Sequence, residues 1–165
     1  MILLFTFNIG FAHDQPKLQK VKVSLPLFKT YQVNSLYPGI AAKVDLNSNP
    51  KKKLFRTAIK TEYKILKLNF AGHYCLVHWG CGSECQESAI VDLVTGKVYD
   101  GVDASLGYKF ETNSRMVIIN PLNDKGEIDD YFCRSCRPEV WIWNEITKKF
   151  YSKKLEFTSS SKEVN

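Results

Sequence analysis

The sequence predicts a mainly β domain, an antiparallel sheet of hairpins with one amphipathic helix packed on it, for which α+β is the alternative label. Three observations carry this prediction. After Leu68, apolar and polar residues alternate with the period of two that is typical of strands. β-branched and aromatic residues are enriched in the same half of the chain. Only the stretch from Pro50 to Tyr63 has its apolar residues at helical spacing.

The length of 165 residues fits one domain with a hydrophobic core and is short for two. The first segment, MILLFTFNIGFA, is apolar and ends in small residues, as a secretory signal peptide does, although no basic residue precedes it. We therefore expect a signal peptide over residues 1–12, one globular domain over 13–156 and a disordered tail over 157–165. A buried N-terminal strand is the alternative for the first segment.

Charge and missing motifs narrow the function classes. The formal net charge of +6 permits an anionic partner but specifies no chemistry. The sequence has no mature apolar run of membrane-spanning length, no nucleic-acid motif, no phosphate loop and no nucleophile elbow. We therefore expect no nucleic-acid partner, no transmembrane segment in the mature chain, no cofactor and a monomer, and an enzyme is the less favoured class.

The first part of the chain leads into the helix. Between His13 and Asn49, short alternating runs are broken by prolines and Gly39, which favours edge strands or an extended arm. Ser48 and Asn49 then precede Pro50, which is the pattern of a capping side chain before a proline in the first helical turn. We expect this helix to pack on the sheet through its apolar positions, which are Leu54, Phe55, Ala58 and Ile59.

The second half contains the strand candidates HYCLVHW, SAIVDLV, KVYDGV, RMVIINP and EVWIWNEI. Two predicted hairpins, residues 89–100 and 141–152, align without gaps. Each has a polar residue and a threonine around a turn whose left-handed position falls on Gly96 or Lys148. The Lys148 turn should be the more strained, because lysine has a side chain where glycine has none. Shared turn chemistry explains this similarity better than a repeat architecture does.

The five cysteines allow three interpretations. In an exported chain, disulfides among Cys81, Cys85, Cys133 and Cys136 are the default, either within the two close pairs or crossed between them. Cys75 is then a buried thiol in mid-strand. The same C-x3-C and C-x2-C spacing also fits a structural zinc site, and Cys133-Arg-Ser-Cys136 could be a redox pair.

A catalytic alternative centres on the histidines. His73 and Cys75 share one face of an extended strand and could act as base and thiol. Together with His78, Cys81 and Cys85 they define the alternative function, a thiol- or zinc-dependent enzyme or redox protein. The simpler interpretation is that His73 bonds a neighbouring loop and Cys75 belongs to the core, because a mid-strand thiol is usually buried and unreactive.

Four motifs occur in order along the chain: FRT at 55–57, NFAGHY at 69–74, WGCGSECQ at 79–86 and VDLVTGKVY at 91–99. This set resembles a family of small exported bacterial proteins of unassigned function, with the pattern NFAGHY, WGCG[ST]xCQ and VDxxTGKVY. The resemblance implies export, a single domain and a loop tied at Cys81 and Cys85. It implies no activity and no cofactor, and Cys75, Cys133 and Cys136 depart from its pattern.

We therefore expect a non-catalytic binding or inhibitory module of the bacterial cell envelope, periplasmic or secreted. The expected partner is an envelope protein or an anionic polymer, the latter through the basic face of the helix. A periplasmic inhibitor of a lytic enzyme, with a rigid loop entering a cleft, matches this description by analogy. The expected contact residues are Trp79, Gly80, Gly82, Ser83, Glu84 and Gln86.

Overall fold

The computed structural model describes residues 21–127 and 136–159. The expected signal peptide over residues 1–12 lies outside this range, as do Cys133 and residues 160–165. The elements in chain order are β1 (Val21–Val23), η1 (Phe28–Tyr31), η2 (Leu46–Ser48), η3 (Pro50–Phe55), α1 (Arg56–Leu66), β2 (Tyr74–Gly82), β3 (Cys85–Asp92), β4 (Val98–Asp100), β5 (Tyr108–Phe110), β6 (Met116–Ile119), β7 (Glu139–Asn144), β8 (Lys149–Lys153) and β9 (Phe157–Ser159).

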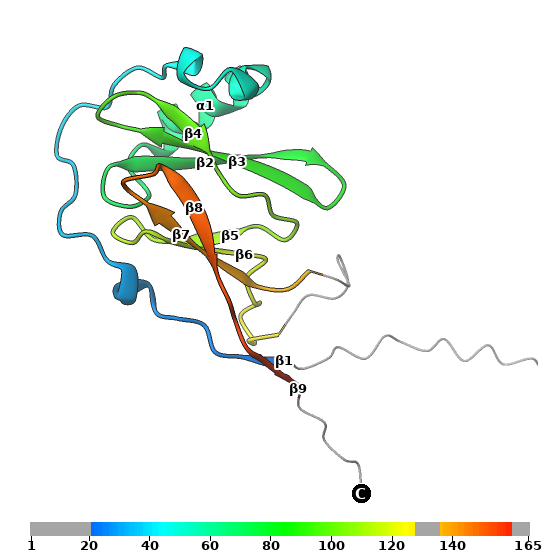
Figure 1. Ribbon diagram of the computed structural model, residues 1–165. Coiled ribbons are helices and arrows are strands. Elements are labelled where there is room, and N and C mark those ends of the chain that lie inside the picture. The colour runs from blue at the N-terminus through cyan, green and yellow to red at the C-terminus, as the bar shows by residue number, and fades with distance from the viewer. Residues whose placement is uncertain (1–20, 128–135, 160–165) are drawn as a thin grey trace, which may run out of the picture.

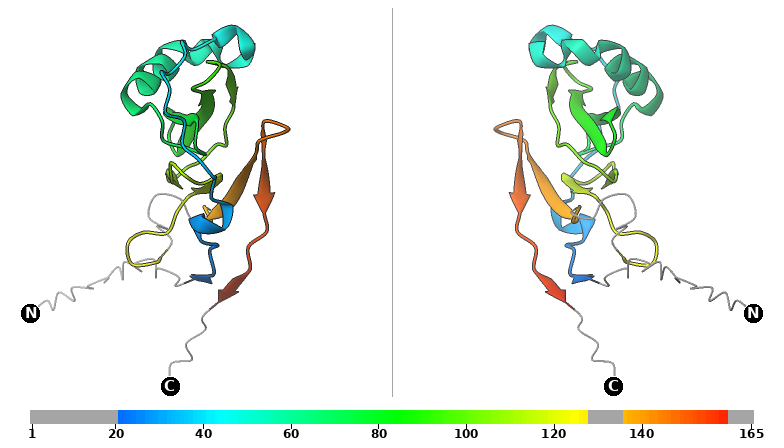
Figure 2. Two further views of the ribbon diagram at one scale, coloured as in Figure 1. Left: turned by 90° about the vertical axis from the view of Figure 1, so that its left-hand side faces the viewer. Right: turned by 90° about the vertical axis from the view of Figure 1, so that its right-hand side faces the viewer.

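The predicted mainly β fold with one packed helix is confirmed (Figure 1). The strands of the described residues form three antiparallel sheets with the orders β2-β3-β4, β5-β6-β7-β8 and β1-β9. Helix α1 lies on one side of the β2-β3-β4 sheet and the β5–β8 sheet lies on the other (Figures 1 and 2). The domain is therefore a stack of helix, sheet and sheet.

Successive side chains of a strand point to opposite faces of the sheet, so the central sheet contributes apolar residues to a core on each side. On β2, Tyr74 and Leu76 face the second sheet, whereas Cys75 and Val77 face the helix. Trp143 is fully buried between the two sheets, where its ring lies 5.3 Å from that of Tyr74. A third apolar cluster covers the outer side of the second sheet, where the N-terminal arm packs on it; its fully or nearly fully buried members are Met116, Ile118, Val140 and Ile142.

The start of the helix differs from the prediction. Residues 50–55 form a 3-10 helix, and only from Arg56 does the chain become α-helical. A 3-10 helix has about three residues per turn rather than about 3.6, which rotates the apolar positions away from the expected face. Leu54 is therefore 85% exposed and does not pack on the sheet, whereas Ile59 is fully buried. Asn49 does not cap the helix, since its side-chain amide donates to Asp100 instead.

The chain end is also more ordered than predicted. The expectation of a disordered tail is wrong for Phe157–Ser159, which form β9 and pair with β1. These residues lack a hydrophobic pattern, but the ladder satisfies their backbone groups all the same. A polar composition therefore did not reveal this strand.

The two similar hairpins have the predicted turns. Gly96 and Lys148 both have positive φ values, 76° and 53°, and each amide donates to the residue four positions earlier, Asp92 or Asn144. The side chains of Asp92 and Asn144 accept from backbone amides within their own turns. Local turn chemistry thus accounts for the resemblance of the two segments.

A polar cluster ties the two sheets together at the second of these turns. The Glu145 carboxylate accepts hydrogen bonds from Tyr74 Oη at 2.5 Å, Trp143 Nε1 at 3.0 Å and Lys148 Nζ at 2.6 Å. His73 Nε2 lies 3.2 Å from the same carboxylate. Burial alone would raise the pKa of Glu145, but the hydrogen bonds from Lys148 and Tyr74 outweigh it, so this pKa lies below its usual value.

We expect the substitution Glu145→Gln to remove a pH-dependent part of the stability. Because the folded-state pKa of Glu145 is lowered, its contribution is complete above the ordinary value and is lost as the pH falls through the folded-state pKa. Urea unfolding between about pH 3 and pH 7 should show the natural protein losing more stability on acidification than the variant does. Parallel curves for the two proteins would contradict the role given to Glu145.

Candidate functional site

The candidate site is the far end of the β2–β3 hairpin, residues Gly80–Gln86, which we call the tip. Figure 1 shows the hairpin extending past helix α1 and strand β4. The first four residues of β2 are buried, whereas Gly80 to Glu84 are exposed. The register shifts between Gly80 and Gly82, and Gly82 then pairs with Cys85. The tip is thus an exposed, irregular turn carried by two strands that are buried at their other ends.

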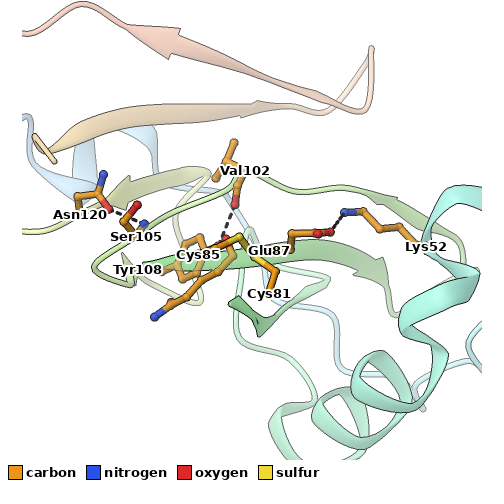
Figure 3. Close-up of a disulfide and its surroundings, with 9 residues drawn as sticks. Lys52, Cys81, Cys85, Glu87, Val102, Ser105, Tyr108 and Asn120 are labelled. Carbon is orange, nitrogen blue, oxygen red and sulfur yellow. Dashed lines mark hydrogen bonds and ion pairs between the residues drawn. A yellow bond between two sulfur atoms is a disulfide. The ribbon is translucent and has the colours of Figure 1, made fainter. Parts of the chain in front are cut away.

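A disulfide closes the tip. Cys81 and Cys85 are bonded, with their Cα atoms 5.1 Å apart (Figure 3). Of the alternatives that the sequence left open, the local pairing is therefore the one found for these two residues. Cys136 is also disulfide-bonded, and Cys133 lies outside the described residues.

The backbone of the tip has two unusual conformations. Gly82 has a φ of 132° and Glu84 a φ of 55°. Such values favour glycine, so Glu84 occupies a position where a side chain is disfavoured. A Cβ atom built on Gly80 or Gly82 would have no described atom within 4 Å of it. Gly82 therefore serves the shape of the turn, and both glycines leave its backbone accessible.

One side of the tip is anchored by the segment before the helix. The Trp79 ring stacks on Phe55 with a centroid distance of 4.8 Å, and Lys52 Nζ lies 5.3 Å from the Trp79 ring. Lys52 also forms an ion pair of 3.2 Å with Glu87, the residue opposite Trp79 in the ladder (Figure 3). The η3 segment thus holds both strands at the base of the tip.

The other side is anchored by the loop that follows β4. Gln86 and Ala104 exchange backbone hydrogen bonds of 2.8 and 2.9 Å, and Tyr108 Oη donates to the Gln86 carbonyl at 2.9 Å. The His78 and Tyr108 rings lie 5.1 Å apart. Burial raises the pKa of Tyr108 to about 12, so its hydroxyl remains a donor at neutral pH. The hairpin is thus held at Trp79 and at Gln86, and Gly80 to Glu84 form the exposed part of the tip between them.

The predicted contact residues fall into two groups. Gly80, Gly82, Ser83 and Glu84 are exposed on the tip, whereas Trp79 and Gln86 are half-buried at its base. Two buried polar atoms at this base, Trp79 Nε1 and Gln86 Oε1, have no hydrogen-bond partner within residues 21–127 and 136–159. The tip presents backbone amides and carbonyls, one hydroxyl and one carboxylate, which are groups for hydrogen bonding to a partner.

The structure does not bring together the two residues on which the catalytic alternative depends, His73 and Cys75. The prediction that His73 and Cys75 share a strand face is wrong, because β2 begins only at Tyr74 and His73 belongs to the preceding turn. The His73 ring packs on Tyr74 at 4.0 Å and faces Glu145, whereas Cys75 faces the helix. Among the residues that the structure describes, no group of three or more metal-ligating side chains could hold an ion.

Cys75 should be unreactive in the folded protein. Its side chain is fully buried, and burial raises the pKa of the thiol to about 12. At about pH 8, we expect no labelling of native protein by a thiol reagent, and labelling of the Cys75 peptide once denaturant is added without reductant. Rapid labelling of native Cys75, seen by mass spectrometry of its peptide, would contradict this and revive the thiol-enzyme alternative.

Sequence reasoning missed the residues that hold the tip in place. Tyr108 and Ala104 lie far from the cysteines in sequence, and no local pattern distinguishes them from other residues of their segment. Lys52 belongs to the basic residues of the predicted helix, for which the sequence suggested an anionic polymer and not the hairpin as the contact. Glu87 alone carried a usable signal, because it lies opposite Trp79 once the hairpin register is known.

Comparisons with protein families, with curated proteins and with solved structures give no match to this chain. The functional conclusion therefore depends on the geometry of the chain itself. No helix in the described part of the chain has the length and apolar character needed to cross a membrane.

Proposed function

We propose that this chain is a non-catalytic, exported binding or inhibitory module whose contact element is the tip, Gly80–Gln86. The observation that carries the proposal is the combination of a disulfide-closed, exposed turn with a base anchored on both sides. A loop fixed before binding loses little conformational entropy when a partner immobilises it. A protruding and preordered turn is suited to enter a concave site on another protein.

The chemical groups on the tip limit the class of partner that it can bind. Glycine backbone, Ser83 and Glu84 offer hydrogen bonds without a large apolar anchor. The Glu84 carboxylate on the exposed turn favours a partner cleft that supplies amide, arginine or lysine donors. By analogy, a cell-wall lytic enzyme with a substrate cleft is the class of partner we put first.

Export is part of the proposal. Disulfides persist in oxidising compartments, and the described residues include the Cys81–Cys85 bond and a further disulfide-bonded cysteine, Cys136. The apolar start of the chain is consistent with a signal peptide. The proposed location is therefore the periplasm or the exterior of the cell.

The test is inhibition by the purified mature protein. We expect it to slow a peptidoglycan-cleaving enzyme from a panel of such enzymes, and Ser83→Arg to weaken this inhibition by about tenfold or more, because a bulky cation no longer fits the cleft. Ile146→Arg is the matched control, since it adds the same charge to an exposed turn of the other hairpin. Equal weakening by both variants, or no inhibition and no binding across the panel, would overturn the proposal.

A further inference from the structure

A concave site lies beside helix α1 and involves no residue of the protruding tip. It is a groove of about 830 Å³ between α1 and the segment 37–44. This volume falls within the range of about 300–1,000 Å³ that is usual for small-molecule sites. We call it the α1 groove. Its apolar lining comes from Tyr37, Ala42, Val44, Tyr63, Leu68 and Leu93.

The walls of the α1 groove are fixed by hydrogen bonds. Tyr63 Oη donates to the Ala42 carbonyl at 2.9 Å and joins the helix to the segment 37–44. On the sheet side, the Ala42 amide donates to the Leu93 carbonyl at 2.8 Å, and the Tyr37 amide donates to the Gly72 carbonyl at 2.7 Å. These three hydrogen bonds fix the segment 37–44 against the helix and the sheet.

The rim of the groove carries one sign of charge. Four lysines line it, and none of the described residues that line it is acidic; the lysines are Lys43, Lys60, Lys64 and Lys67. None of the four has an ion-pair partner among the residues that the structure describes. Ile40, also at the rim, is 93% exposed. An apolar floor beneath unpaired cations is complementary to a molecule with an apolar chain and an anionic head.

We propose that the α1 groove binds a single-chain anionic lipid, with the acyl chain on the apolar floor and the carboxylate or phosphate head among the lysines. The recess between α1 and the segment 37–44 is the reason to favour one molecule over a membrane surface. A bilayer requires apolar side chains that protrude from the protein. The six apolar lining residues named above are instead buried or half-buried. Exposed Ile40 then covers part of the bound chain.

Titration calorimetry with dodecanoate, dodecyl phosphate and uncharged dodecanol, each below its aggregation limit, tests the proposal. We expect both anionic ligands to bind, and the double variant Lys60→Glu/Lys64→Glu to weaken them by about tenfold or more while changing dodecanol binding much less. The relative affinities of dodecanoate and dodecyl phosphate identify the preferred head group. Lys29→Glu/Lys109→Glu is the matched control, because both lysines are exposed and lie outside the groove.

A second variant tests the floor. Ala42→Trp should fill the groove and abolish binding of charged and uncharged ligands alike, with an unchanged circular dichroism spectrum as evidence of folding. Equal weakening by the control lysine pair, absence of binding to every ligand, or binding only to anionic vesicles would overturn the proposal. None of these outcomes tests binding by the tip, so the failure of one proposal would leave the other unaffected.

Discussion

Replacing Gly96 by alanine is expected to lower the free energy of unfolding by about 2–4 kcal/mol. A Cβ atom at this position would lie 2.0 Å from the carbonyl oxygen of Lys43. The backbone there also has a φ of 76°, which disfavours any side chain. Because the neighbour is backbone rather than a flexible side chain, the segment around Lys43 has to move. Urea denaturation followed by circular dichroism measures the loss.

Gly126→Ala is the matched control. Its φ of 74° is almost the same as that of Gly96, but an added Cβ would have no atom of residues 21–127 or 136–159 within 4 Å. The free energy of unfolding of this variant should fall by only about 1 kcal/mol, which is the cost of a side chain in the left-handed conformation. Equal losses in the two variants would show that the close approach of Lys43 to Gly96 does not contribute to stability.

Opening the disulfide at the tip is expected to weaken partner binding by roughly 30-fold. The double variant Cys81→Ser/Cys85→Ser frees a short loop whose closure is worth about 2 kcal/mol in the chain-entropy model, and an affinity changes tenfold for each 1.4 kcal/mol. The rest of the domain should stay folded, since both sides of the hairpin base keep their anchors. Inhibition constants for the partner enzyme measure the effect.

Reductant supplies an internal control for this second prediction. Treating the natural protein with dithiothreitol should reproduce the affinity of the double variant, whereas the double variant itself should not respond. A response of the double variant would point to the disulfide of Cys136 instead. Unchanged affinity in both experiments would mean that a fixed tip is not needed for binding.

Local features of the fold could be predicted from the sequence. The period of two located β2, β3 and β7, and the turn residues around Gly96 and Lys148 predicted two hairpins with left-handed positions. These features depend on residues a few positions apart, which is the range over which sequence patterns carry information. The local Cys81–Cys85 disulfide was among the predicted pairings for the same reason.

Long-range features could not be predicted. The division into three sheets depends on which strands pair, and alternation does not specify the partner of a strand. Phe157–Ser159 form a strand only because β1 lies beside them. The exposure of Leu54 follows from a 3-10 turn that the helical spacing concealed.

The candidate site also has a local part that the sequence indicated and a long-range part that it did not. Its cysteines and glycines form a local motif, and a turn closed by Cys81–Cys85 was one of the alternatives that the sequence offered and the one that the family resemblance implied. Its anchors, Tyr108 and Lys52, contact the hairpin base across 22 and 35 positions of sequence. No pattern within the motif indicates such contacts, so the sequence predicted the tip but not the way in which it is held.

The most direct test of the central claim, that the tip is ordered before any partner binds, is backbone 15N relaxation of the free oxidised protein. We predict order parameters of about 0.8 or higher for the amides of Gly82, Ser83 and Glu84, similar to those of the buried part of β2. Values below about 0.6 at these three amides, typical of a flexible loop, would contradict the account.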